Sequence, residues 1–454
     1  MNAIGLDIGT TSLCGVCVDA ATGEVRKTVT RPNTAALQST QPWEKTQDVR
    51  ALLACVREIF DELAAGGAAC VGVTGQMHGI VYLNAKGEPV SPLYTWQDGR
   101  GDRPFRDGKT YAQYASDVTG RPLATGYGAV THFYNTVNGL VPPDAVCFCT
   151  VHDLCVMALT GRKSPLTHPS DAASFGLFDA ENDRFDDEAI HALGLTPDFF
   201  PAVAQGEIAA GATAAGVPVS VAVGDNQAGV LGSLADLPHS LLVNVGTGSQ
   251  LSCVVPRYIR QDGLDCRPLA EGRYLLAGSA LCGGRAYAIL EAFFRQVVRE
   301  IGGTEIDSAY PAMDKMMETA LPDDPLTVTT TFAGTRAEPG KRGAVENIGI
   351  ANLTPAALCD GVLGGMVREL LGYRDTMAPF FAAPPTKLVG SGNGLRRNAA
   401  LRSRVAREFG LPLKIPVNRE EAAFGAALYG TVCAGLYASL DDTRRLIHYE
   451  ETEG

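Results

Sequence analysis

The sequence predicts an α/β protein made of two domains. Short apolar segments typical of strands alternate along the chain with amphipathic segments typical of helices, which is the pattern of α/β proteins. A second observation is a strand, a Gly-Thr turn and another strand, a pattern that occurs near the start of each half. The third is length, because 454 residues exceed what one hydrophobic core usually serves.

The first half opens with two strand patterns and a long helix pattern. Residues 4–8 and Ser12–Asp19 are apolar runs that predict strands around a glycine-threonine turn. Residues 46–65 carry apolar side chains three and four positions apart, which predicts an amphipathic helix. Residues 69–74 and 219–224 are short apolar runs that each lead into a polar loop, so we expect two more strands there.

The end of the chain continues this alternation. Residues 387–390 predict a strand that runs into a glycine-rich turn. Residues 397–409 and 419–434 have the apolar spacing of helices, and residues 413–415 predict a short strand between them.

One sequence pattern occurs twice. Leu6-Asp-Ile-Gly-Thr-Thr-Ser12 is echoed by Val243-Asn-Val-Gly-Thr-Gly-Ser249, at a separation close to half the chain. Because each copy stands at the start of a half, we interpret the echo as an internal duplication. The domain boundary is expected near residues 233–241, which gives an N-terminal domain over 1–234 and a C-terminal domain over 235–454.

Charge and hydropathy exclude some function classes. The net charge is −12, and the sequence has no basic stripe of the kind that binds phosphate backbones, so no nucleic-acid partner is expected. No apolar run approaches the roughly 20 residues needed to span a bilayer, and the first residues lack the features of a signal peptide. We therefore expect a cytoplasmic protein without a membrane partner.

Twelve cysteines raise the question of a disulfide or zinc site. Cys14 and Cys17 form a C-x-x-C pair, but both lie within an expected strand. Positions three apart on a strand point to opposite faces, so these two thiols would not converge on one metal ion. We expect all twelve cysteines to be reduced and packed.

The two Gly-Thr turns are candidate phosphate sites. A small-residue turn between two strands can direct backbone N–H groups into one concavity, to which the hydroxyls of Thr10, Thr11, Ser12 and Thr247 would add donors. Asp7, at the end of the first strand, could hold Mg²⁺ through water beside the phosphates. The alternative is that both turns are ordinary β-hairpins.

Two common nucleotide motifs do not match. Gly161-Arg-Lys-Ser164 lacks the second glycine of a Walker A loop. Gly390-Ser-Gly-Asn-Gly394 has G-x-G-x-G spacing in place of G-x-G-x-x-G, and it comes late in the chain. This segment is interpreted either as a flat platform for a purine and ribose or as a plain turn from strand to helix.

Asp225 is the candidate catalytic base. It follows the apolar run of residues 219–224, which would hold its carboxylate rigidly at a strand end. Phosphoryl transfer to an alcohol needs a carboxylate near the attacking hydroxyl and little else from the protein besides positioning and charge neutralisation. A helix N-cap is an equally good interpretation of Asp225 from its position alone.

Two loops have the side chains expected around a polyol. Gln76, Met77 and His78 stand between two glycines, so their side chains can point out of the strand. A second loop supplies an apolar plate, an acceptor and a forked donor with Trp96, Asp98 and Arg100. Sugars present hydroxyl pairs along an apolar face, which matches these groups. The alternatives are a structural histidine, a core tryptophan and a surface Asp98–Arg100 pair.

Together these motifs resemble the FGGY family of carbohydrate kinases, within the actin-like ATPase superfamily, over essentially the whole chain. Asp7-Ile-Gly-Thr-Thr-Ser12 is similar to the family's first phosphate motif and Gly246-Thr-Gly-Ser249 to its second, with a departure at Gly248, where the second motif often has Ser. Asp225 falls at the family's catalytic aspartate. The resemblance further implies ATP contacts at four residues: Gly283, Gly284, Gly392 and Asn393.

The resemblance implies two actin-like (ribonuclease H-like) domains around a central cleft, with sugar and phosphate binding in the first domain and nucleotide binding in the second. It also implies that the last helix packs back across the junction of the domains. It implies ATP and Mg²⁺ as cofactors and a ketose as the acceptor. Four strings favour sedoheptulose over D-xylulose or a related pentulose: Thr95-Trp-Gln-Asp-Gly-Arg100, Thr125-Gly-Tyr-Gly-Ala-Val-Thr-His-Phe-Tyr134, Thr150-Val-His-Asp153 and Ser170-Asp-Ala-Ala-Ser-Phe-Gly176. A non-catalytic sugar-binding regulator is a more distant alternative, and the oligomeric state stays open, a homodimer included.

Overall fold

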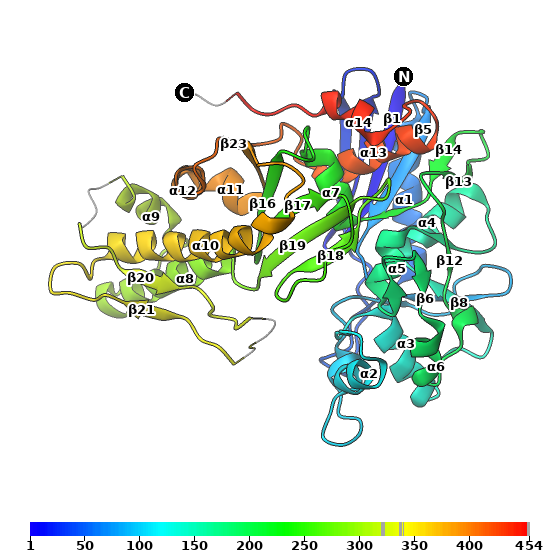
Figure 1. Cartoon of the computed structure of the whole chain (residues 1–454), viewed down its shortest axis with the longest axis horizontal. Helices are drawn as coiled ribbons and strands as arrows, with labels where there is room; N and C mark the ends of the chain where they lie inside the picture. Colours follow the sequence, from blue (N-terminus) through cyan, green and yellow to red (C-terminus); the bar gives the residue numbers. More distant parts are fainter. Residues whose placement is uncertain (319–322, 336–337, 339, 452–454) are drawn as a thin grey trace. The chain divides into compact units, whose positions relative to one another are not determined.

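The computed structural model describes residues 1–318, 323–335, 338 and 340–451, and these form two compact α/β units (Figure 1). The first unit contains Met1–Ala235, Arg267–Arg273 and Asn418–His448. The second contains Asp236–Cys266, Tyr274–Val417 and the residues from Tyr449 onward. A single cut in the sequence therefore does not separate the units, because two later segments return to the first one.

The first unit is built on a mixed sheet with the strand order β13-β14-β5-β1-β2-β3, in which β15 also pairs with β5. Strands β1, β2 and β3 are antiparallel neighbours, whereas β5 runs parallel to β1. The strands of this sheet are β1 (Asn2–Ile8), β2 (Ser12–Asp19), β3 (Val25–Pro32), β5 (Cys70–Gly75), β13 (Ala209–Ala212), β14 (Pro218–Ser220) and β15 (Val223–Gly224).

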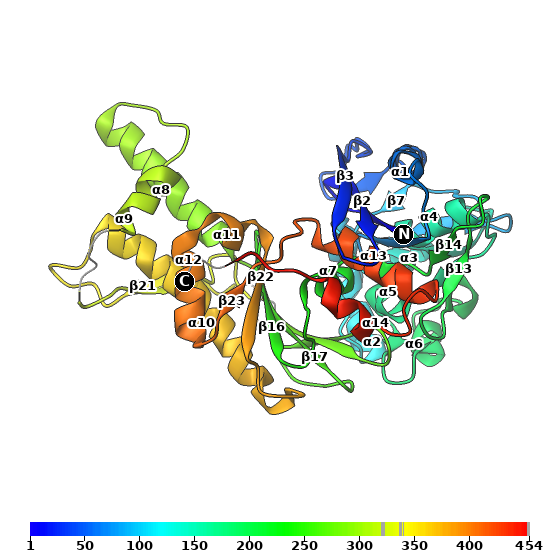
Figure 2. The same ribbon diagram turned by 90° about the horizontal axis from the view of Figure 1, so that it is seen from above.

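Two helices cover opposite faces of this sheet: α1 (Val49–Ala64) and α13 (Glu421–Cys433) (Figure 2). A side chain added at Gly15 would meet Ile59 of α1, whereas one added at Gly5 would meet the backbone of α13. Glycines on the strands therefore let both helices approach closely. One apolar core of the unit contains side chains of α1, of residues 151–159 and of the sheet.

The remaining elements of the first unit extend the sheet and surround it. The helices are α2 (Tyr111–Thr119), α3 (Gly128–Val137), α4 (Val151–Thr160), α5 (Pro169–Phe175), α6 (Asp187–Ala192), α7 (Asp225–Ser233) and α14 (Leu440–Thr443), with short 3₁₀ helices η1 (Gly99–Asp102), η2 (Pro197–Phe199) and η4 (Arg444–Leu446). The short strands are β4 (Thr46–Gln47), β6 (Val81–Asn84), β7 (Leu93–Tyr94), β8 (Ala145–Cys149), β9 (Leu166–Thr167), β10 (Phe178–Asp179), β11 (Arg184–Phe185) and β12 (Ala202–Val203).

The second unit is built on a sheet with the order β18-β19-β17-β16-β22-β23. Its strands are β16 (Ser240–Val245), β17 (Ser249–Val255), β18 (Asp265–Pro268), β19 (Tyr274–Ala280), β22 (Lys387–Ser391) and β23 (Leu413–Lys414), and a separate two-stranded sheet pairs β20 (Thr327–Thr329) with β21 (Ala344–Glu346). The helices are α8 (Gly284–Gly302), α9 (Tyr310–Met316), α10 (Pro355–Met377), α11 (Gly392–Arg397) and α12 (Ala399–Phe409), with the 3₁₀ helix η3 (Ala378–Phe380).

The two sheets repeat one strand order. In the first unit β3-β2-β1 are antiparallel and β5 follows in parallel with β1. In the second unit β19-β17-β16 are antiparallel and β22 follows in parallel with β16. Each Gly-Thr turn joins the equivalent pair of strands in its unit, so the sequence echo has a counterpart in topology.

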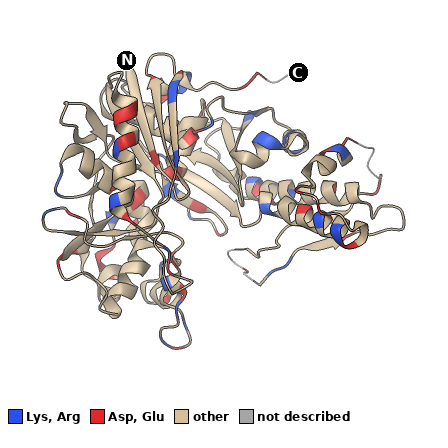
Figure 3. Ribbon diagram, turned by 180° about the vertical axis from the view of Figure 1, so that it is seen from behind, with Lys and Arg blue, Asp and Glu red and all other residues tan. Residues whose placement is uncertain are grey.

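Charged residues of both signs are mixed along the exposed helices. Figure 3 shows Lys and Arg interspersed with Asp and Glu along α1 and α8. On α8 one such pair is Arg295 and Glu291, 3.0 Å apart and four residues apart in sequence. Among the described residues, no helix is long and apolar enough to cross a bilayer.

Most sequence-based element boundaries agree with the structure to within a few residues. The helix expected from residue 46 begins at Val49, because Thr46–Gln47 forms β4 and the Asp48 side chain accepts hydrogen bonds as the N-cap of α1. The strand expected over residues 219–224 is two short strands, β14 and β15. All twelve cysteines are free thiols, as expected.

Candidate active site

The first Gly-Thr turn joins β1 to β2 and is held by its neighbours. Asn33 donates from its side chain to the Gly9 carbonyl at 2.9 Å and from its backbone N–H to the Thr11 carbonyl at 2.9 Å. A side chain at Gly9 would come within 2.7 Å of the Ser12 carbonyl oxygen, so this turn requires glycine. Thr11 is exposed, and Thr10 and Ser12 are half-buried. The turn therefore presents its hydroxyl side chains on a fixed backbone.

The carboxyl ends of three strands place Asp7 and Asp225 in one neighbourhood. In the parallel pairings, Ile8 of β1 and Gly224 of β15 both lie opposite Gly75 of β5. Asp7 directly precedes Ile8 and Asp225 directly follows Gly224, so the two carboxylates flank the same row of the sheet. Residues at the ends of neighbouring parallel strands commonly form the binding site of α/β proteins.

Asp225 begins helix α7 and is not its N-cap. The N-cap is Gly224, and no side chain makes a capping hydrogen bond there. The N-cap interpretation of Asp225 is therefore wrong, although the Asn226 backbone N–H of the same helix donates to its carboxylate.

The electrostatics of this neighbourhood favour protonated carboxyls. Burial raises the pKa of Asp225 to about 6, with the charge of His152 acting in the opposite direction. Burial also raises the pKa of Asp7 to about 7, and the nearby charges of Asp225 and Glu420 add to the effect. A carboxylate with a pKa close to neutrality is suited to accept a proton.

The loop after β5 carries Gln76, Met77 and His78. His78 has a positive φ of 71°, a conformation that costs energy for a residue with a side chain and is common at functional sites. Its backbone N–H donates to the Ser174 hydroxyl at 3.0 Å, and its ring stacks on Tyr127 at 4.7 Å between centroids. Gln76 and Met77 are buried and His78 is half-buried.

The second sugar loop contains one exposed and two buried members. The Trp96 side chain is exposed to 45% and is not the core tryptophan considered as an alternative. Asp98 and Arg100 are exposed to 0% and 2%, and Arg100 Nε donates to Asp98 Oδ1 at 2.6 Å, so this is a buried pair and not a surface pair. Arg100 also donates to Asn135. Asp98 and Arg100 therefore brace the loop that carries Trp96.

The second Gly-Thr turn lies in the second unit and packs against the start of α8. Gly283 N–H donates to the Thr247 carbonyl at 3.0 Å, and Gly284 N–H donates to the Gly246 carbonyl at 2.9 Å. A side chain at Gly284 would come within 2.6 Å of the Gly246 carbonyl oxygen. In this structure Gly283 and Gly284 thus hold the turn through their N–H groups. Gly248 fits against the Ala280 carbonyl oxygen, which explains a small residue there.

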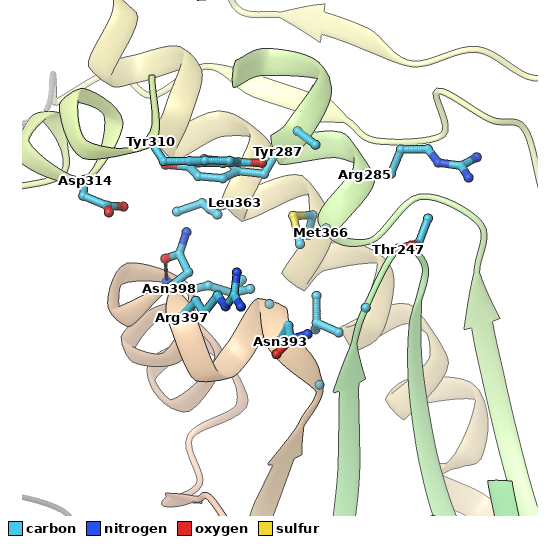
Figure 4. Close-up of a pocket in the computed structure, with 17 residues that line it drawn as sticks. Thr247, Arg285, Tyr287, Tyr310, Asp314, Leu363, Met366, Asn393, Arg397 and Asn398 are labelled. Carbon is cyan, nitrogen blue, oxygen red and sulfur yellow. Dashed lines mark hydrogen bonds between the residues drawn. The ribbon is translucent and has the colours of Figure 1, made fainter. Parts of the chain in front are cut away.

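A cavity of about 960 Å³ lies beside this turn, within the size range of small-molecule sites. Figure 4 shows the rings of Tyr287 and Tyr310 on one side and Arg397 and Asn398 on the other. The two tyrosine rings stack with 6.1 Å between centroids. The remaining lining residues are Val245, Gly246, Thr247, Gly284, Arg285, Ala288, Asp314, Leu363, Met366, Gly392, Asn393, Gly394 and Leu401.

Gly392 and Asn393 form part of the cavity wall. Gly392 has a positive φ of 83°. A Cβ atom added to it would lie 2.6 Å from the Val245 carbonyl oxygen. Only glycine fits such a turn without strain. The segment is therefore a turn from β22 into α11 that also lines one side of the cavity.

The structure adds residues that the sequence did not single out. His152 and Asp171 form a buried ion pair, with 3.0 Å between Nε2 and Oδ1, near the two aspartates. Both occur in strings that carry the family resemblance, which was their only signal. The tyrosines of the cavity and the buried Gln47 had no signal, because nothing in their local sequence distinguishes them from core residues.

The carboxylates suit Mg²⁺ only together with a phosphate ligand. Asp7 Oδ1 is buried and has no hydrogen-bond partner, which leaves one oxygen available for a cation or its water. Within the described part of the chain, no group of three or more His, Cys, Asp or Glu residues could hold a metal ion by itself. Mg²⁺ usually takes one or two protein carboxylates and completes its shell with water and substrate phosphates, so the residues fit it in that form.

Comparison with known proteins finds similar sequences along nearly the whole chain. Residues 2–232 match the model of the FGGY family of carbohydrate kinases, N-terminal domain. The chain is 28% identical to a sedoheptulokinase of Mus musculus over 94% of this chain and 96% of that protein. It is 27% identical to a xylulose kinase of Streptomyces coelicolor over 93% of this chain and 86% of that protein.

The fold is shared with solved sugar kinases. The structure of a xylulose kinase from Rhodospirillum rubrum superimposes with a TM-score of 0.84, covering 99% of this chain and 93% of that one, at 20% sequence identity. The predicted fold class, α/β with actin-like ATPase domains, is thereby confirmed.

Proposed function

Because this chain belongs to the FGGY family of carbohydrate kinases, we propose that it transfers the γ-phosphoryl group of ATP to the terminal primary hydroxyl of a ketose, with sedoheptulose as the preferred acceptor. The products would be sedoheptulose 7-phosphate and ADP. The similarity to the mouse sedoheptulokinase along nearly the full length of both proteins supports this choice of acceptor. D-Xylulose is the second candidate, since a xylulose kinase is almost as similar.

The observation that carries the proposal is the shared row of Ile8, Gly75 and Gly224, which sets Asp7 and Asp225 on either side of β5, at the carboxyl ends of β1 and β15. One carboxylate has the pKa of a base that works near neutrality. The other keeps an unsatisfied oxygen at the end of the strand that leads into a phosphate-type turn. Phosphoryl transfer to an alcohol needs both groups.

Asp225 is assigned the role of general base. Its carboxylate would accept the proton of the primary hydroxyl as the hydroxyl oxygen forms a bond to the γ-phosphorus. The bond between the γ-phosphorus and the bridging oxygen breaks, and its electron pair leaves with ADP. A base contributes about 100-fold or more to such a step.

The remaining residues bind and orient the two substrates. Gln76, Met77, His78 and Trp96 are assigned to the sugar. Asp98 and Arg100 are assigned to the same sugar site, where their buried pair also supports the Trp96 loop. Thr10, Thr11 and Ser12 in the first unit, and Gly246 and Thr247 in the second, are assigned to phosphate. Asp7 would hold Mg²⁺ through water, and the ion, when bound, neutralises negative charge on the phosphates.

The adenosine of ATP is assigned to the cavity of the second unit. Its stacked Tyr287 and Tyr310 rings offer an aromatic surface, and Gly392 and Asn393 offer a flat backbone edge. Gly284 also lines this cavity, and the N–H groups of Gly283 and Gly284 hold the Gly246–Thr247 turn beside it.

A turnover assay with a panel of acceptors tests the proposal. ADP release from MgATP would be measured with no sugar and with sedoheptulose, D-xylulose, D-ribulose and glycerol, and the phosphorylated position would be identified by ³¹P NMR. We expect the highest kcat/KM with sedoheptulose and a 7-phosphate product. A preference for D-xylulose would establish the second candidate, and no sugar-dependent release would support a non-catalytic regulator.

The base is tested separately with Asp225→Asn. This variant should bind sugar as the natural protein does, but its kcat should be lower by about 100-fold or more. Sugar binding would be measured by calorimetry, so that a folded but inactive enzyme is distinguished from a misfolded one. Turnover close to that of the natural protein would remove Asp225 from the mechanism.

A further inference from the structure

A closed set of hydrogen bonds surrounds the first Gly-Thr turn. Trp96 Nε1 donates to the Thr10 hydroxyl at 2.9 Å, and that hydroxyl donates to Gln76 Oε1 at 3.4 Å. Gln76 Nε2 donates to Gln47 Oε1 at 3.0 Å, and Gln47 Nε2 donates to the Thr10 carbonyl at 3.3 Å. The residues assigned to sugar thus contact the turn assigned to phosphate directly at the Thr10 hydroxyl, and Gln47 joins Gln76 to the Thr10 carbonyl by a second route.

Gln47 is held firmly in this position. Its side chain is buried, and Asn33 donates to the same Oε1 at 3.4 Å. Its backbone pairs with Leu93 of β7, and the next residue, Asp48, caps helix α1. A side chain fixed on both sides by secondary structure can transmit a change at one partner to the other.

The Thr10 hydroxyl has only one proton to donate. In this structure it donates that proton to Gln76 and accepts from Trp96. A phosphate oxygen can receive the same proton only if Gln76 Oε1 gives it up. A sugar hydroxyl that donates to Gln76 Oε1 would replace Thr10 there and free its proton for phosphate.

We propose that Gln47 is a positioning residue that couples the sugar loop to the phosphate turn, so that an acceptor sugar bound at Gln76 and Trp96 strengthens the binding of ATP at Thr10. This inference rests on the proposed function. Gln47 keeps the amide end of Gln76 and the Thr10 carbonyl in place, so the sugar changes only the partner of the Thr10 hydroxyl. The same arrangement would keep ATP turnover low when no sugar is bound.

Gln47→Leu tests the coupling, because leucine has a similar size and removes all of the amide's hydrogen bonds. The affinity for a non-hydrolysable ATP analogue with Mg²⁺ would be measured by calorimetry, without sugar and with saturating sedoheptulose. In the natural protein we expect saturating sedoheptulose to lower the Kd of the ATP analogue about tenfold, within the usual range of coupling between sites. In Gln47→Leu this factor should fall to about one.

Two further variants separate coupling from folding. Gln47→Glu keeps the acceptor for Gln76 and loses the donor to Thr10, so it should show reduced coupling and replaces the leucine variant if that variant does not fold. Gln38→Leu changes an exposed glutamine nearby and should keep the tenfold factor. A purely structural role for Gln47 would lower the thermal midpoint without changing the ratio of the two affinities.

The outcomes distinguish this inference from the proposed function. If the natural protein releases ADP with a ketose and a folded Gln47 variant keeps the same sugar-dependent tightening, Gln47 has no coupling role and the proposed function stands. If the natural protein releases no ADP with any ketose of the panel, the proposed function fails, and the inference fails with it.

Discussion

The imidazole of His152 lies 3.0 Å from the carboxylate of Asp171, measured from Nε2 to Oδ1, and both side chains are completely buried. Burial is the largest single effect and favours a neutral ring, but the charge and hydrogen bond of Asp171 together with the charges of Asp153 and Asp225 outweigh it and raise the pKa of His152 to about 9. The protein therefore keeps a buried positive charge at neutral pH.

This charge acts on the two aspartates of the candidate site. His152 Nδ1 would come within 3.0 Å of a side chain at Gly75, the residue opposite both Ile8 and Gly224 in the sheet. The imidazolium lowers the pKa of Asp225 and of Asp7, against the larger effect of their burial. Without His152, both carboxyls would hold their protons to higher pH.

His152→Gln should therefore move the activity profile toward higher pH. The base must be ionised, so kcat/KM of the natural protein should rise as the pH passes through about 6 and then level off. Loss of the imidazolium should shift this rise upward by about one pH unit, the lower end of the effect of a close opposite charge. The measurement is kcat/KM for the preferred ketose from pH 5 to 9.

His239→Gln is the matched control, since this histidine is exposed to 44% and pairs with Asp236 in the second unit. Its profile should overlay that of the natural protein. An unshifted profile in folded His152→Gln would show that the imidazolium does not tune Asp225.

Asp225→Asn should stabilise the protein at alkaline pH. The pKa of Asp225 is raised from 3.8 to about 6, so its contribution to stability is fully present below pH 3.8 and is lost as the pH rises through 6. Above that pH the buried carboxylate costs about 3 kcal/mol, on the order of two pKa units. Thermal midpoints measured without Mg²⁺ should be higher for the variant at pH 8 and equal near pH 4. Equal midpoints at pH 8 would mean that the carboxylate is well solvated.

The sequence was sufficient to predict most helices and strands that it was used to predict, and to identify the residues next to the Gly-Thr turns. Apolar runs and glycines are local signals, and β2, predicted as Ser12–Asp19, has those bounds in the structure. Asp225 could be found because it follows such a run directly. Its freedom from a capping role could not, since that depends on Gly224 adopting the N-cap conformation.

Features that depend on distant contacts were out of reach. The bounds of the returning segment, Asn418–His448, follow from the packing of α13 on β1 and β5, which no local pattern encodes; the family resemblance alone implied that the last helix packs back across the domain junction. Asp98 and Arg100 have the composition of a surface pair, and only the fold buries them. The stacking of Tyr287 and Tyr310 likewise joins two helices that are separated by a loop.

Tyr310→Ala should weaken the binding of ATP selectively. The Tyr310 ring lines the cavity of the second unit and stacks on Tyr287, so its loss removes aromatic surface from the proposed adenosine site. We expect KM for ATP to rise about five- to tenfold, which corresponds to the free energy of one aromatic contact, whereas KM for the sugar should not change. Phe293→Ala, an exposed aromatic residue on α8, should change neither. An equal rise in both KM values would place Tyr310 outside the nucleotide site.

Gly72→Ala should prevent α13 from packing on the sheet. A side chain at Gly72 of β5 would overlap the Ala426 carbonyl of α13, a backbone atom that cannot move without the helix. We expect the free energy of unfolding to fall by about 3 kcal/mol or more, the upper end of overpacking effects, and the thermal midpoint to fall with it.

Gly372→Ala in α10 is the control. Nothing lies within 4 Å of its added side chain, and alanine in a helix interior should raise the free energy of unfolding by about 0.5–1 kcal/mol. Equal midpoints for Gly72→Ala and the natural protein would show that α13 does not contact β5 this closely. Because Glu420 directly precedes α13, its charge would then no longer raise the pKa of Asp7.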